Sequence, residues 1–82
     1  MKSIKRFNNA AEIFDEYGPN ITKKERAFFE NEIDYSDIAI YVVDDESVII
    51  CDSINGSVCN EMSLENFEFE SFDFYAKETW IY

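Results

Sequence analysis

The side chains that could do chemistry in this chain are 18 carboxylates and two thiols, because the sequence has no histidine. Histidine is the commonest general base and a common transition-metal ligand, so its absence removes two routes to an active site. Cys51 and Cys59 supply only two of the four soft ligands that a structural zinc site needs. We therefore expect no catalytic residue, no metal site and no cofactor, and we expect that the protein is not an enzyme.

The acidic run Asp44-Asp45-Glu46 has the ligands of a calcium or magnesium site but not the spacing. An EF-hand loop alternates its ligands around a central glycine, whereas these three acids are consecutive. The run therefore predicts a solvated loop. Carboxylate pairs suited to glycoside hydrolysis can be drawn freely from so many acids, and no glycine-rich phosphate loop or nucleophile elbow occurs. These absences favour binding over catalysis.

Charge is divided very unevenly along the chain. Residues 1–26 sum to +2 and residues 27–82 to −13, and the fifty residues from Ala27 to Ala76 contain no lysine or arginine. Like charges at this density destabilise the compact state beyond what solubility requires. Direct binding of nucleic acid is excluded, since its affinity comes from basic side chains on phosphates. A basic nucleic-acid-binding protein or nuclease is the partner that such a charge attracts.

Aromatic and acidic residues alternate in the stretch from 66 to 76, NFEFESFDFYA. In a strand, Phe67 and Phe69 fall on one face and Glu68 and Glu70 on the other. The pattern slips by one residue after Glu70, which predicts a bulge or a tight turn. Whether residues 64–82 form one bent strand or a hairpin stays open. A half-buried, solvated strand shows the same alternation, so solvation is the alternative to a functional face.

The elements before this stretch are predicted from capping signals and hydrophobic period. A helix over residues 9–17 begins with Asn9 and Glu12 three positions on, and residues 2–7 are either its extension or an edge strand. A second helix over residues 22–33 begins with the same type of signal. From residue 37 the period changes to two, which predicts strands over residues 38–43, 47–52 and 57–62.

The dipeptide Asn55-Gly56 predicts a two-residue hairpin loop between the second and third of these strands. In that register Cys51 lies opposite Asn60 and Cys59 lies opposite Asp52, so the two thiols are diagonal neighbours and not a disulfide. We expect buried, reduced cysteines.

Together these elements predict an α+β fold, with two N-terminal helices packed on one face of a three- to five-stranded antiparallel sheet. The composition, 46 % hydrophobic and 17 % aromatic, predicts an ordered chain, and 82 residues predict a single small acidic domain over residues 1–82. No apolar run is long enough to cross a membrane and no signal peptide is recognisable, so we expect a cytoplasmic protein without membrane contact. The acids would line the sheet face that the helices leave free.

In size, in charge and in its lack of catalytic groups, the whole chain is similar to small phage proteins that block host defence nucleases, the anti-restriction and anti-CRISPR inhibitors. The similarity implies a non-catalytic inhibitor whose acidic face mimics nucleic acid. An immunity protein or antitoxin against a nuclease toxin is the alternative, with aromatic anchors such as Tyr75, Trp80 or Tyr82. Homodimerisation stays open. The predicted partner-binding carboxylates are Asp44, Asp45, Glu46, Glu61, Glu65, Glu68, Glu70 and Asp73.

Overall fold

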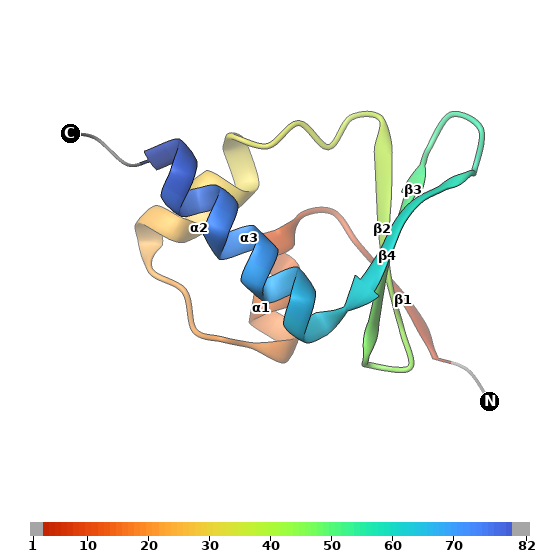
Figure 1. Ribbon diagram of the computed structural model, residues 1–82, viewed down its shortest axis with the longest axis horizontal. Helices are drawn as coiled ribbons and strands as arrows, with labels where there is room; N and C mark the ends of the chain where they lie inside the picture. Colours follow the sequence, from red (N-terminus) through yellow and green to blue (C-terminus); the bar gives the residue numbers. More distant parts are fainter. Residues whose placement is uncertain (1–2, 80–82) are drawn as a thin grey trace.

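The computed structural model describes residues 3–79 and contains one sheet and three helices (Figure 1). The predicted α+β class is confirmed, although a short strand precedes the two N-terminal helices and a third helix follows the sheet. In chain order the elements are β1 (Ile4–Phe7), α1 (Ala10–Tyr17), α2 (Lys23–Asn31), β2 (Ile38–Val43), β3 (Ser47–Asp52), β4 (Val58–Ser63) and α3 (Leu64–Thr79).

The four strands are antiparallel and lie in the order β1-β2-β3-β4. All three helices lie on one side of the sheet, which Figure 1 shows nearly edge-on. Ile40, Val42 and Val48 point toward the helices and are almost completely buried there. The prediction that helices cover one sheet face is thus confirmed, and residues 4–7 form the edge strand that was one of the two expected alternatives.

The capping residues predicted for the first two helices do what their types allow. The Asn9 side chain accepts a hydrogen bond of 3.0 Å from the Glu12 amide, which satisfies a free amide at the start of α1. Thr22 and Glu25 exchange both hydrogen bonds of a capping box at the start of α2. Gly18 ends α1 at φ 85°, a backbone conformation that costs glycine little.

The segment predicted to be a strand, from residue 64 onward, is the 16-residue helix α3. Its sequence contains no glycine or proline, and its only β-branched residue is Thr79. The Asn66 amide donates to the Ser63 hydroxyl at 3.1 Å, so Ser63 caps the helix. Near the other end, Lys77 pairs with Asp73 at 2.9 Å, one helical turn away. The alternation of Phe with Glu was therefore a misleading signal.

Helical spacing redistributes the aromatic residues that a strand would have aligned. Phe67 is 7 % exposed and packs on Phe14 of α1, while Phe69 is 72 % exposed. Phe72 contacts Phe14 and Phe29, with ring centroids 5.3 Å and 5.5 Å apart. The helix thus buries one face against α1 and α2, since residues three and four apart share a face.

The sheet face away from the helices differs from the prediction, because it is mainly apolar and not acidic. The acids of residues 65–73 belong to α3, on the helix side of the sheet. Strand pairing assigns the side chains of this face, which we call the uncovered sheet face. Its members are Ile4, Arg6, Ala39, Tyr41, Val43, Ser47, Ile49, Cys51, Val58, Glu61 and Ser63.

The loop between β3 and β4 is longer than the predicted two residues. The Asp52 amide donates to the Ser57 carbonyl at 2.8 Å, and the Gly56 amide donates to the Asp52 carbonyl at 2.8 Å. Cys51 therefore pairs with Val58, and a register shift leaves Cys59 without an opposing residue. Both thiols are free, as expected, but Cys59 is exposed and Cys51 is half-buried, so the prediction of buried cysteines was wrong.

The helical register of α3 predicts opposite outcomes for two neighbouring phenylalanines. Phe67→Ala should lower the free energy of unfolding by about 3–5 kcal/mol, because it empties a buried site. Phe69→Ala, the matched control, should leave it unchanged or raise it slightly, since alanine favours an exposed helix position. Urea unfolding followed by circular dichroism measures both. A large loss at both positions would support a strand, in which the two rings share a face.

Candidate partner-binding surface

The eight predicted partner-binding carboxylates fall into three places in the fold. Asp44, Asp45 and Glu46 form the tight connection between β2 and β3. Glu61 lies on the edge strand β4 and belongs to the uncovered sheet face. The remaining four lie on α3, and they are Glu65, Glu68, Glu70 and Asp73.

Two of the three acids in the β2–β3 turn have a structural role. Asp44 and Asp45 adopt φ values of 55° and 57°, which aspartate tolerates better than most residues with a side chain. The Asp44 carboxylate accepts a hydrogen bond of 2.9 Å from the Ser3 amide. Asp45 accepts a hydrogen bond of 2.7 Å from the Tyr17 hydroxyl and lies 3.6 Å from the Lys5 ammonium. The turn is thereby attached to β1 and α1.

These contacts shift the pKa values of the groups involved. The hydrogen bond from Tyr17, and then the charge of Lys5, lower the pKa of Asp45, while partial desolvation opposes the shift. Partial burial raises the pKa of Tyr17, and the hydrogen bond and charge of Asp45 raise it further. Asp45 is thus held ionised beside a neutral tyrosine.

The β2–β3 turn and the start of α3 lie next to each other. The Leu64 amide donates to the Glu46 carbonyl at 3.0 Å, and Ser47 pairs with Ser63 across the sheet. The structure thus brings the turn and the helix together but not Glu61, whose strand position points it to the opposite side of the sheet. We call the joined group the acidic strip, and its members are Asp44, Asp45, Glu46, Glu65, Glu68, Glu70 and Asp73.

The helix changes both the direction and the spacing of the acids in α3. Glu68 and Glu70 point about 200° apart on the helix and not to one face, as the strand prediction required. Glu65 through Asp73 occupy only about 12 Å of helix axis, since the rise is about 1.5 Å per residue. Measured along the helix axis, four acids in that length approach the spacing of about 3.4 Å per phosphate along one DNA strand, although their directions spread over about 200° around the helix. Alternate acids on a strand would lie about 6.6 Å apart.

Few carboxylates have a basic partner in the described part of the chain. Lys5 pairs with Glu16 and Asp45, Arg26 with Asp15 and Glu30, and Lys77 with Asp73. Within residues 3–79, the other carboxylates have no lysine or arginine nitrogen within 4.0 Å. In the acidic strip, only Asp45 and Asp73 are neutralised in this way. The strip therefore keeps most of its charge available to a partner.

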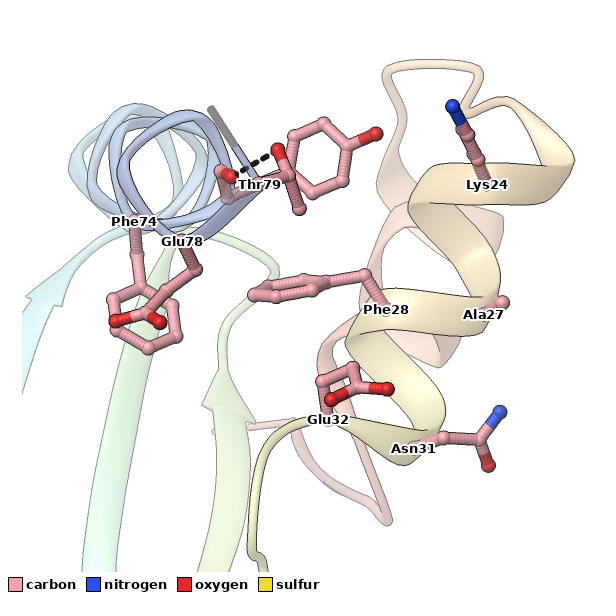
Figure 2. Close-up of a pocket in the computed structure, with 9 residues that line it drawn as sticks. Lys24, Ala27, Phe28, Asn31, Glu32, Phe74, Glu78 and Thr79 are labelled. Carbon is pink, nitrogen blue, oxygen red and sulfur yellow. Dashed lines mark hydrogen bonds between the residues drawn. The ribbon is translucent and has the colours of Figure 1, made fainter. Parts of the chain in front are cut away.

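A groove of about 640 Å³ separates the C-terminal half of α3 from α2, and the sequence did not predict it. Phe28 of α2 and Phe74 of α3 extend into this groove, with Glu32 and Glu78 beside them (Figure 2). Lys24 lies at its upper end in that view. Phe74 is 44 % exposed although its ring centroid lies 5.8 Å from that of Phe28. The groove thus combines an apolar floor with charged margins, acidic at Glu32 and Glu78 and basic at Lys24.

The signal that could have identified the helix beside this groove was the helical spacing of the apolar residues Leu64, Phe67, Phe74 and Tyr75, of which the last two line the groove. A strand assignment hid it, because that assignment placed every phenylalanine of the stretch in one core. Among the aromatic anchors named from the sequence, Tyr75 lines the groove and packs on Phe28 at a centroid distance of 5.1 Å. Trp80 and Tyr82 lie outside the described residues.

No known protein family, characterised protein or solved structure matches this chain. Residues 3–79 contain no group of three or more histidine, cysteine or acidic side chains arranged to hold a metal ion. No helix in that range is both long enough and apolar enough to cross a membrane. Function must therefore be argued from the surface itself.

The contact between Asp45 and Tyr17 predicts a pH-dependent contribution to stability. Because folding lowers the pKa of Asp45, this contribution is present above its ordinary pKa of about 3.9 and is lost as pH falls through the lowered value. Asp45→Asn keeps the turn conformation but cannot ionise. The stability difference between the native protein and this variant should therefore shrink below about pH 4.

Urea unfolding at a series of pH values measures that difference. Other acids, including Asp15 beside Arg26, titrate in both proteins and cancel in the comparison. Glu46→Gln is the control, since it removes the same charge from the same turn and the Glu46 side chain makes no hydrogen bond within residues 3–79. A pH-independent difference for Asp45→Asn would contradict the prediction.

Proposed function

We propose that the protein is a non-catalytic inhibitor whose acidic strip occupies the DNA- or RNA-binding site of a basic protein. The observation that carries this proposal is the concentration of carboxylates from the β2–β3 turn into α3, most of which have no basic partner within residues 3–79. A basic groove selected to bind phosphates attracts such a surface by the same long-range field. The working compartment of this proposal is the cytoplasm, and its type is that of phage anti-restriction or anti-CRISPR inhibitors.

Part of the acidic strip is held in place by contacts within residues 3–79, which supports this function. Asp44 and Asp45 are held by Ser3, Tyr17 and Lys5, and α3 is anchored by buried aromatic rings. Charges that are already positioned lose little conformational entropy on binding, so more of the electrostatic attraction remains as affinity. A disordered acidic tail would lose more on ordering.

A second candidate function is an immunity protein or antitoxin that neutralises one nuclease toxin. The α2–α3 groove favours it, because the exposed ring of Phe74 beside Glu32 and Glu78 resembles the apolar centre and charged rim of a specific interface. In this case Phe74 and Tyr75 would hold an apolar anchor of the toxin. The acidic strip would then steer the encounter and contribute less to affinity.

Charge reversal in the acidic strip should weaken binding to the target. The triple variant Glu65→Lys, Glu70→Lys, Asp73→Lys should lose at least about 100-fold in affinity for a captured basic protein, because like charges then face each other. Asp37→Lys is the control, an exposed acid before β2 at the opposite end of the sheet from the turn. Affinity capture from host extract at low and high salt, followed by titration with the purified target, gives these values.

If the acidic strip mimics nucleic acid, the chain must also compete with nucleic acid for binding to the target. Labelled duplex DNA or RNA should be displaced from the purified target by the native chain and not by the triple variant, and capture should fail at high salt. A target that keeps its nucleic acid while bound, or an affinity indifferent to salt and to the triple change, would refute the proposal.

An alanine scan separates the two candidate functions. If the chain is an immunity protein, Phe74→Ala should cost at least about 2 kcal/mol of binding free energy, as hot-spot residues do. Single changes in the acidic strip should then cost little. Under mimicry the pattern is reversed, with Phe74→Ala near neutral and losses spread over the strip. Thermal unfolding of each variant must stay near that of the native chain for the comparison to count.

A further inference from the structure

The uncovered sheet face carries a charge pattern that is complementary to itself. Strand pairing aligns Arg6 with Tyr41, Tyr41 with Ile49 and Ile49 with Glu61, so these side chains form one row across the sheet. The row is basic at the β1 edge, acidic at the β4 edge and apolar between them. The strand register directs no other charged side chain to this face, so the side chains that it assigns there sum to zero charge in a chain of net charge −11, although Asp52 at the end of β3 borders the face.

The same face exposes apolar side chains that nothing in residues 3–79 covers. Ile4 and Val58 are 64 % and 60 % exposed, whereas Val42 and Val48 on the helix side are buried. A shallow hollow beside Ala39, lined also by Arg6, Tyr41 and Cys51, indents this face. The half-buried side chains of Tyr41, Val43 and Ile49 lie between these two edges and make the face largely apolar, which is typical of an interaction site.

We propose that two copies of this chain associate through their uncovered sheet faces, with Arg6 of each copy paired to Glu61 of the other. In this arrangement a two-fold axis runs parallel to the strands, midway between β2 and β3. Rotation about it exchanges the two edges of the sheet but leaves each row at the same position along the strands, so that each row faces the same row of the second copy. It places β1 over β4 of the second copy. Tyr41 then lies over Ile49, and the hollow beside Ala39 gives the facing side chains room to interdigitate.

The charge pattern selects this arrangement over the other face-to-face one. An axis across the strands would place Arg6 over Arg6 and Glu61 over Glu61, which is repulsive. Packed sheets lie about 10 Å apart with their strands nearly aligned, a gap that an arginine and a glutamate side chain span together. The net charge of −11 opposes close approach of two copies in general, and this face, which carries one charge of each sign, is a place where that repulsion is small.

The area predicts a weak dimer. Neighbouring strands lie about 4.8 Å apart and each residue adds about 3.4 Å along a strand, so a face of four strands and six residues covers about 400 Å² per copy. A standard protein–protein interface buries about 800 Å² per partner. Association should therefore be sought at high concentration. It does not depend on the proposed inhibition, because the acidic strip lies on the helix side and stays accessible in the dimer.

Sedimentation velocity of the full chain from about 10 µM to about 1 mM tests the proposal. The native chain should show a concentration-dependent monomer–dimer equilibrium. Arg6→Glu and Glu61→Arg should each weaken it at least about tenfold, because both cross-pairs become repulsive. An equimolar mixture of the two variants should dimerise at least as well as the native chain, since each mixed pair is then attractive. Ile49→Asp should abolish the dimer.

Two control variants match the changes in net charge. Lys24→Glu on α2 changes the net charge by the same amount as Arg6→Glu. Glu70→Arg on α3 changes it by the same amount as Glu61→Arg. Neither control variant should change the monomer–dimer equilibrium. Because restoration in the mixture requires both variants to be folded, misfolding cannot imitate the expected result. A native chain that stays monomeric throughout the range, a dimer insensitive to the Arg6 and Glu61 changes, or a mixture that fails to restore association would each overturn the proposal.

Discussion

The packing of aromatic rings around Phe29 is the interaction on which the rest of the structure depends. Phe29 is completely buried and contacts Phe14 of α1, Phe28 of α2, and Phe72 and Tyr75 of α3. Its carbonyl accepts a hydrogen bond of 2.6 Å from the Tyr35 hydroxyl. Ring pairs at these distances add attraction to the free energy of burial. The cluster holds three short helices that would be marginal alone.

The position of the aromatic cluster decides where the charge goes. Because α3 turns Phe67, Phe72 and Tyr75 inward, Glu65, Glu70 and Asp73 take exposed directions around the helix, whereas Glu68 is half-buried at the edge of the packed face. The helical rise also brings them closer together along the axis than a strand would. The acidic strip is thus a consequence of how the aromatic face is buried. Its repulsion is tolerated because the chain buries a large apolar core on the other side of the same helix.

The two sides of the molecule have different characters, and the proposed activities are divided accordingly. The helix side holds the acidic strip and the α2–α3 groove, both suited to a basic partner. The uncovered sheet face is neutral and apolar, and is suited to a second copy of the chain. An antiparallel sheet often leaves one face exposed to solvent, but such a face is usually polar. An apolar one implies that something covers it.

The sequence by itself determined the α+β class, both N-terminal caps and the strands β2 to β4, because these depend on local capping groups and on unbroken hydrophobic periods. It also determined the charge asymmetry and the absence of histidine. Only the tertiary structure decided that residues 64–79 are helical, since Phe and Glu alternate in a way compatible with either period over a few residues. Burial of Phe67 against Phe14 selects the helix. That choice moved the acids of α3 to the helix side and left Glu61 as the one predicted partner-binding residue on the uncovered sheet face.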